Sequence, residues 1–262
     1  MAKKIVICNR KGGVGKTSTV ANVAAILAES GHSVLAVDLD SQCNLTMSFG
    51  VDSESLERSA NDVLLGRCSL HDAALSKGDN LALVAARPDL EKVVSSREVS
   101  SHGRKFELLK FAIAEADRLY DYIIIDTPTH VESVNGINGL SVADFAVVPL
   151  ILDRYSLGGV RQVMDIVRGL RDQWINRELR ILGLLPTFYQ ANTKVCRKYL
   201  TIFLESKYKD LLFTTKIRRS AAIPTAASRG IPVTLYDRHS HGYEDYAKVT
   251  AEMLARMGEG NA

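Results

Sequence analysis

The chain has 262 residues, of which 46% are hydrophobic and 24% are charged, and its formal net charge at pH 7 is +3. This composition fits one large α/β domain with a substantial core, and it excludes disordered and fibrous proteins. No apolar run approaches the roughly 18 residues of a membrane span, and the first residues lack the organisation of a signal peptide. We therefore expect a cytosolic protein that has no membrane partner.

The cysteines exclude several kinds of site. The four are far apart in the sequence, and no C-x-x-C pair suggests zinc, a redox dithiol or an iron–sulfur cluster. We expect reduced, mostly buried packing residues at Cys8, Cys43, Cys68 and Cys196.

The first predicted elements are a strand over residues 5–8, a glycine-rich loop and a helix over residues 19–29. Glycines allow successive backbone N–H groups to turn toward a phosphate, and the N-terminus of the helix adds unpaired donors and partial positive charge. We predict that Lys16 contacts the β- and γ-phosphates of a nucleotide and that Thr17 binds Mg²⁺. The predicted nucleotide-binding residues are Lys11, Gly12, Gly13, Val14, Gly15, Lys16, Thr17 and Ser18.

This loop departs from the usual pattern G-x-x-x-x-G-K-[ST], because Arg10 stands where the first glycine is expected. With a second lysine, Lys11, at its head, the loop resembles that of the ParA/MinD group of deviant Walker ATPases. The resemblance implies that Lys11 reaches across a dimer to the nucleotide of the partner subunit and takes part in catalysis. The alternatives are a glycine turn that only joins strand to helix, and a solvated lysine at position 11.

A second strand, over residues 33–37, leads into Asp38 and Asp40. Open α/β sheets bind ligands at this end of their strands, where a cation or an oriented water would explain two carboxylates. The segment resembles the family's D-x-D-P-Q-x-N box, with Ser41 and Cys43 replacing its proline and glycine. The resemblance implies that Asp40 orients the attacking water, while Asp38 supports Mg²⁺ and the loop. The alternative for Asp40 is an N-cap of the following helix.

Residues 51–104 show no recognisable chemistry, and only short helices near residues 60–65 and 88–94 and a strand over residues 81–85 are predicted there. A helix is predicted over residues 105–119. The apolar strand over residues 122–126 then ends in Asp126, which we expect to hold Mg²⁺ directly or through water. Parallel strands would bring it to the same sheet edge as the glycine-rich loop. Residues 127–129 resemble the family's switch region.

Five further elements complete the predicted chain, together with a final helix near residues 243–257. A strand over residues 145–150 leads into residues 153–159 and a long helix, which resemble the family's dimer interface. A strand over residues 181–187, a helix over residues 195–205 and a strand over residues 211–215 follow.

Basic residues gather in the last third of the chain, where residues 191–262 hold 12 Lys and Arg against 7 Asp and Glu. ParA-type proteins bind DNA without sequence preference through a basic surface in this region, although relatives often carry arginine where Asn192 and Ala222 stand here. The alternative is a solvated charged face. His239 and His241 are interpreted as part of a turn. The predicted DNA-binding residues are Lys194, Arg197, Lys198, Arg218, Arg219 and Arg229.

The sequence therefore predicts an α/β fold with a mostly parallel twisted sheet, helices on both faces and P-loop NTPase architecture in a single domain over residues 1–262. The resemblance implies a MgATP-hydrolysing dimer that partitions plasmid or chromosomal DNA. It would bind nonspecific DNA in its ATP form, associate with the nucleoid in a bacterial or archaeal cytosol, and be stimulated by a ParB-like protein. The alternatives are a positioner of protein cargo without DNA binding and a MinD-like membrane-positioning ATPase.

Overall fold

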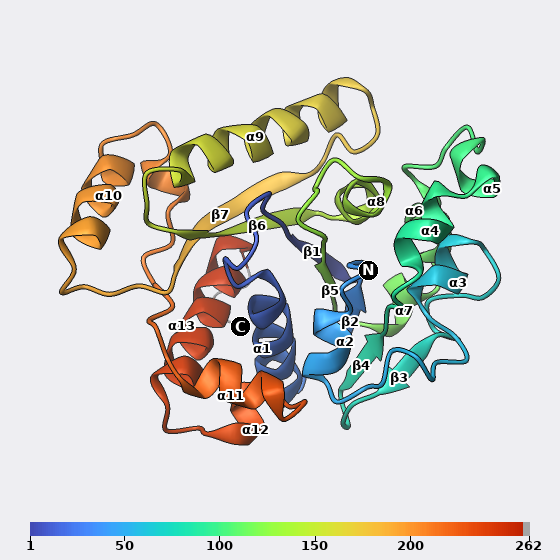
Figure 1. Cartoon of the computed structure of the whole chain (residues 1–262), viewed down its shortest axis with the longest axis horizontal. Coiled ribbons are helices and arrows are strands. Elements are labelled where there is room, and N and C mark those ends of the chain that lie inside the picture. Colours follow the sequence, from blue (N-terminus) through green and yellow to red (C-terminus); the bar gives the residue numbers. More distant parts are fainter. Residues whose placement is uncertain (259–262) are drawn as a thin grey trace.

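The computed structural model describes residues 1–258, and its framework is a seven-stranded sheet in the order β3-β4-β2-β5-β1-β6-β7 (Figure 1). All neighbouring strands are parallel except β3 and β4. The predicted fold class is confirmed. The strands are β1 (Lys3–Ile7), β2 (Val34–Asp38), β3 (Ala74–Ser76), β4 (Leu81–Val84), β5 (Tyr122–Asp126), β6 (Phe145–Ile151) and β7 (Arg180–Thr187).

Helices cover both faces of this sheet and form two hydrophobic clusters with it. One face carries α1 (Lys16–Glu29), α2 (Asn44–Ser48), α11 (Ala222–Ser228), α12 (Val233–Tyr236) and α13 (His241–Arg256). The other carries α3 (Ala60–Leu64), α4 (Leu90–Ser95), α5 (Arg97–Ser100), α6 (Leu108–Ala112), α7 (Ala116–Leu119), α8 (Val134–Val142), α9 (Ser156–Asp172) and α10 (Lys194–Leu204). Because both faces are covered, β1, β2 and β5 are buried almost throughout. Their sequences are apolar except for the two lysines that begin β1 and the aspartates that end β2 and β5.

The C-terminal helix belongs to the body of the fold. Helix α13 packs against α1 (Figure 1), and it buries Tyr246, Val249 and Met253 in the same cluster as α1. Within residues 1–258, no helix is both long and apolar enough to cross a bilayer. The last four residues of the predicted domain, 259–262, lie outside the described part of the chain.

Two predicted elements are wrong. The helix expected over residues 105–119 is divided into α6 and α7, and Asn138 of α8 explains where α6 begins. Its side chain accepts from the N–H of Leu109 (2.9 Å) and donates to the carbonyl of Lys105 (2.8 Å), so these groups bond outside a continuous helix.

The strand expected over residues 211–215 is instead a 3₁₀ turn, η1 (Lys209–Leu211), followed by an isolated bridge between Leu184 and Leu212. Glu252 of α13 accepts from the backbone N–H groups of Thr214 and Thr215, each at 2.8 Å. Those donors are therefore occupied by a side chain and cannot extend a ladder. The short antiparallel strand β3 and helix α8 were not predicted.

Candidate nucleotide-binding site

Three neighbouring strands bring the predicted motifs to one edge of the sheet. In the strand pairing, Asp126 of β5 lies opposite Ile7 of β1 on one side and opposite Asp38 of β2 on the other. The glycine-rich loop follows β1 directly and leads into α1. Segments more than 100 residues apart in the sequence therefore meet where parallel α/β sheets bind their ligands.

The backbone of the loop has the shape that its glycines allow. Gly13 and Gly15 have φ angles of +69° and +84°, which a residue with a Cβ atom seldom adopts. Gly15 precedes α1 and offers no side-chain cap, so the first N–H groups of the helix remain available to an anion. Lys16 begins the helix and is only 7% exposed.

A residue from a distant strand fastens this loop. The Thr187 hydroxyl at the end of β7 lies 2.9 Å from the carbonyl oxygen of Val14 and 3.1 Å from that of Leu150. Its backbone position, opposite Ile151 of the neighbouring strand, comes from β6–β7 pairing. This role of Thr187 was not predicted, although its place at the end of a predicted strand was a usable signal.

Thr17 and Asp126 form the predicted metal-binding pair. The Thr17 hydroxyl donates to Oδ2 of Asp126 at 2.6 Å, while Oδ1 of Asp126 is buried without a hydrogen-bond partner. Burial, followed by the nearby charge of Asp38, raises the pKa of Asp126 well above its ordinary value. A buried carboxylate oxygen without a partner, beside a hydroxyl, fits a divalent cation.

The protein would supply only part of the coordination of that cation. Across residues 1–258, no cluster of three or more His, Cys, Asp or Glu side chains could hold a metal ion. Mg²⁺ usually keeps several waters and is bound by one or two protein groups plus phosphate oxygens. The pair of Thr17 and Asp126 is suited to this arrangement.

Asp38 organises the loop after β2. Its carboxylate accepts from the N–H of Asp40 (3.0 Å), and from the N–H (2.9 Å) and hydroxyl (2.7 Å) of Thr46. Burial raises the pKa of Asp38 to about 6 in spite of these donors. The contacts support its predicted role in the loop, and Thr46 is a second residue that the sequence analysis missed.

Asp40 lies in a turn and does not cap α2. Its Oδ1 accepts from the N–H of Gln42 at 3.0 Å, and its side chain and backbone together are 9% exposed. Helix α2 begins at Asn44, and the residue in the capping position is Cys43, without a side-chain cap. The alternative interpretation of Asp40 as an N-cap is therefore wrong, and its catalytic role stays a prediction.

Lys11 lies against the segment that resembles a dimer interface. Its ammonium group forms an ion pair with Asp153, and its N–H donates to Oδ1 of Asn9 at 3.0 Å. Residues 9–11, together with Tyr155, Ser156, Gly158 and Gly159, line a cavity of about 540 Å³. The head of the loop and the start of α9 thus border the same surface.

A second cavity, of about 400 Å³, opens beside the start of α1. Gly15 and Ser18 line one side of it, and residues 217–224 and Tyr246 line the other. Arg219, which the sequence analysis placed in a DNA-binding set, also lines this cavity.

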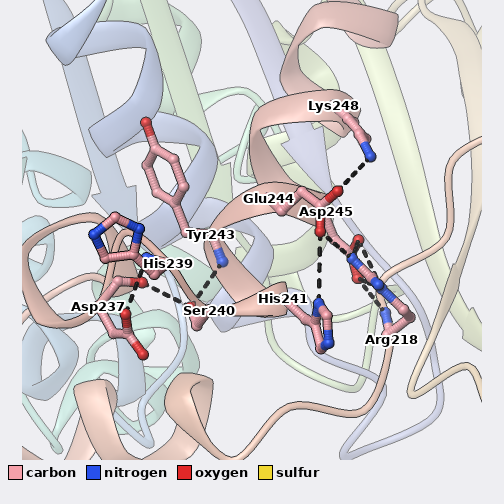
Figure 2. Close-up of polar contacts among 9 residues, drawn as sticks. All are labelled: Arg218, Asp237, His239, Ser240, His241, Tyr243, Glu244, Asp245 and Lys248. Carbon is pink, nitrogen blue, oxygen red and sulfur yellow. Dashed lines mark hydrogen bonds and ion pairs between the residues drawn. The ribbon is translucent and has the colours of Figure 1, made fainter.

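The other basic residues divide into free and paired groups. Lys194, Arg197 and Lys198 are exposed on α10, and Arg229 is exposed with its guanidinium 4.9 Å from the ring of Tyr236. Arg218 is paired instead, with Asp245 and Glu244 of α13 (Figure 2). It donates to their carboxylates at 2.6–3.0 Å, and Asp245 is 4% exposed.

The histidines before and at the start of α13 form no metal pair. Nδ1 of His241 lies 3.5 Å from Glu244, whereas the backbone N–H of His239 bonds the Asp237 side chain (Figure 2). These contacts agree with the interpretation of this segment as a turn.

A P-loop nucleoside triphosphatase with a deviant phosphate loop is the class of protein that this fold and this site define. The comparisons with known proteins agree: residues 2–181 match the family of the AAA domain. Soj of Bacillus subtilis, a sporulation initiation inhibitor protein, is 34% identical over 97% of this chain and 99% of its own length. The chromosome partitioning protein ParA of Caulobacter vibrioides is 30% identical over 96% of this chain and 94% of its own.

A solved structure extends this likeness to three dimensions. Cobyrinic acid a,c-diamide synthase from Mycobacterium smegmatis, with a bound ATP analogue and magnesium, has a TM-score of 0.86 and 30% identity, and the match covers 100% of this chain and 97% of that one. The present chain belongs to the ParA/Soj group of the ParA/MinD family of ATPases. The prediction of an ATPase that uses ATP and Mg²⁺ is thereby confirmed.

Proposed function

We propose that this ATPase is a dimeric switch that positions or partitions plasmid or chromosomal DNA. The observation that carries the proposal is the meeting of Lys16, Thr17 and Asp126 at one sheet edge, beside the exposed head of the loop. The chromosome-partitioning relatives support the cellular task. We also propose that residues 1–262 act as one domain, in the cytosol and at the nucleoid.

Within each subunit, the loop residues from Lys11 to Ser18 would bind the phosphates, and Lys16 would neutralise the β- and γ-phosphates. Thr17 and Asp126 would hold Mg²⁺, with Asp38 supporting them through the loop. Bound Mg²⁺ supplies charge neutralisation between the phosphates. The cavity beside Gly15 and Ser18 has a suitable position for the nucleobase.

Two subunits would complete the switch. Lys11 is half-buried and paired with Asp153 at the surface of residues 153–159. If it is to reach the partner's nucleotide, it must exchange this carboxylate for a phosphate. Asp40, at the same edge, would orient the attacking water, and a ParB-like protein would stimulate hydrolysis.

The exposed cations of α10 support binding to nonspecific DNA. Lys194, Arg197 and Lys198 are spaced by three and four residues, so they project from one side of the helix. Dimerisation would double the charges presented to one duplex, and each neutralised phosphate releases counterions. Arg219 and Arg229 are also proposed DNA contacts, while Arg218 contributes least because Asp245 and Glu244 neutralise it.

A DNA shift assay with and without MgATP tests this function. We expect affinity to rise sharply with ATP, to be nearly indifferent to DNA sequence and to fall steeply with salt. Binding that is equal without ATP would contradict the switch. Complete absence of DNA binding, with ATPase activity intact, would favour the second candidate, a positioner of protein cargo.

The paired state of Arg218 is the observation that favours that second candidate. A membrane-positioning role has no comparable support. Three acidic residues of α13, Glu244, Asp245 and Glu252, lie in ion pairs or hydrogen bonds within the protein, and the apolar side of this helix is buried against α1.

A further inference from the structure

The only tryptophan of the chain stands in an unfavourable backbone conformation at the end of α9. Trp174 has a φ of +63°, and its N–H bonds the carbonyl of Arg171 while the N–H of Ile175 bonds that of Leu170. This is a Schellman motif, in which glycine usually takes the left-handed position because it has no Cβ atom. Trp174 is nevertheless 71% exposed, so burial does not compensate for the strain.

A second exposed aromatic residue lies on α6. Phe111 of α6 is 56% exposed, and it borders a cavity of about 540 Å³. Val63, Leu64 and Leu108 are among the aliphatic side chains that line this cavity. The ammonium group of Lys110 donates to the carbonyl of Ile175 at 3.0 Å, which joins α6 to the segment that carries Trp174.

Cations accompany both rings. The guanidinium of Arg177 lies 3.8 Å from the centre of the Trp174 ring, and that of Arg104 lies 4.7 Å from the centre of the Phe111 ring. Arg177 has no carboxylate partner among the described residues. Residues 104–111 and 171–180 together carry Arg104, Lys105, Lys110, Arg171, Arg177 and Arg180 against Glu107, Asp172 and Glu178. Arg104 and Lys110 both pair with Glu107, and one further carboxylate, Glu115, lines the cavity, so the surface keeps a smaller excess of cations.

We propose that this surface, formed by Phe111, Trp174, their arginines and the adjoining aliphatic cavity, docks an acidic protein segment that carries bulky apolar side chains. The excess of cations selects acidic residues, and the cavity takes an aliphatic or aromatic side chain. Exposed tryptophan beside arginine is the composition of energetically dominant contacts at protein interfaces. A duplex or single strand fits less well, because the cavity offers aliphatic walls to a polar base and each aromatic ring already faces a guanidinium.

This docking surface goes beyond the proposed function. Helix α6 and the C-terminal end of α9 lie toward the opposite end of the molecule from α10 (Figure 1). No residue of the phosphate loop or of the basic set contributes to it. Docking is therefore expected with or without ATP or DNA, and its failure would leave the ATP switch untouched.

Fluorescence of the single tryptophan reports binding directly in the full-length protein. The probe is a tryptophan-free peptide, Asp-Glu-Leu-Phe-Asp-Glu-Leu-Leu-Glu-Asp-Phe, and we expect a saturable shift of Trp174 emission to shorter wavelength. Two control peptides, one with lysine at every acidic position and one with serine at every apolar position, should give no shift. No shift with the acidic peptide, or an equal shift with the lysine peptide, would overturn the proposal.

Variants of the protein show where the peptide binds. Affinity is measured by the fluorescence anisotropy of a fluorescein-labelled form of the peptide. Trp174→Gly, Phe111→Ser and Arg177→Glu should each weaken binding about tenfold or more, whereas Lys209→Glu, on an exposed turn elsewhere, should leave it unchanged. Trp174→Gly relieves the backbone strain and should not lower the melting temperature, so a loss of binding there is not a loss of folding. Unchanged affinity in all three variants would refute this surface.

Two other occupants are tested in the same way. A stronger emission shift with single-stranded oligothymidylate than with the acidic peptide would assign the surface to nucleic acid and overturn the proposal. Self-association that sedimentation detects in the wild type and that Trp174→Gly abolishes would assign it to a second copy of the chain, with the same consequence.

Discussion

The nucleotide edge of the sheet and the basic surface around α10 differ in what holds their charged groups. At the nucleotide edge, side chains from distant segments contact one another: Thr17 bonds Asp126, and Lys11 pairs with Asp153. On α10, Lys194, Arg197 and Lys198 extend into solvent without an ion pair among the described residues. Residues of the candidate nucleotide site therefore already contact one another within one chain, whereas the basic surface needs a duplex or a second subunit to give its charges a common role.

The two regions also differ in the free-energy cost of their charges, because only the nucleotide edge is buried. Asp38 and Asp126 are fully buried, and burial is the main reason that both pKa values are raised. Their charges are costly unless a cation or hydrogen-bond donors accompany them. Exposed lysines carry no such cost and are screened by salt. Substitutions at the edge should therefore have large, specific effects, and substitutions on α10 should have small, salt-dependent ones.

Lys16→Ala should have the largest effect. The lysine is buried at the start of α1, and hydrogen bonds to charged groups contribute about 1.5–3 kcal/mol each. We expect affinity for MgATP, measured by titration calorimetry, to fall by about 100-fold or more. Arg10→Ala is the matched control in the same loop, because Arg10 forms an exposed ion pair with Glu132. Near wild-type binding by Lys16→Ala would mean that the phosphates lie elsewhere.

Asp40→Ala tests chemistry at the same edge without removing a phosphate contact. We expect turnover to slow by about 100-fold, the scale of a positioned proton acceptor, while ATP binding is retained and an ATP-bound dimer accumulates. Steady-state phosphate release and light scattering measure the two outcomes. Asp40→Asn keeps an oxygen for the N–H of Gln42 and should be equally slow. Unchanged turnover in both would leave Asp40 a turn residue only.

The two regions also differ in how far the sequence predicted them. The order Gly15-Lys16-Thr17, together with Asp126 at the end of an apolar strand, was sufficient to predict that these residues meet. Parallel strands have a fixed direction and bring their ends to one edge of the sheet. Thr46 and Thr187 were missed because only the tertiary structure brings their hydroxyls near their partners, which are the Asp38 carboxylate for Thr46 and two backbone carbonyls for Thr187. Asn138 and Glu252 ended two predicted elements in the same way.

The sequence did not show that the charge of Arg218 is neutralised within the protein. Arg218 was grouped with the DNA-binding set because its neighbours are basic, but α13 returns 27 residues later and places Asp245 against it. A count of local charge cannot anticipate a carboxylate from a distant helix. The exposure of Lys194, Arg197 and Lys198 was easier to predict, since residues on the exposed side of an amphipathic helix have few possible partners. Their role in DNA binding stays a prediction.

Arg218→Ala sharpens this distinction. It leaves Asp245, which is 4% exposed, without its main partner, and loss of a charged hydrogen-bond partner costs about 2 kcal/mol. We expect a fall of about 5 °C in the melting temperature measured by calorimetry, with little change in DNA affinity at a temperature where the variant is folded. Lys194→Ala should instead weaken DNA binding and leave the melting temperature nearly unchanged. A destabilised Lys194→Ala or an unaffected Arg218→Ala would show that the two groups of charge are not distinct.

Lys198→Glu should have the smallest effect, and salt makes it measurable. An exposed lysine on α10 that neutralises one phosphate contributes about 0.9 to the slope of log affinity against log salt. The reversal should therefore flatten that slope by about one unit for the ATP-bound protein and weaken binding most at low salt. ATP affinity and dimerisation should remain unchanged, because α10 lies away from the nucleotide edge (Figure 1). Lys92→Glu, an exposed charge on α4, is the matched control and should keep the wild-type slope. A slope that Lys92→Glu changes as much as Lys198→Glu would mean that net charge, and not the surface of α10, sets the affinity for DNA.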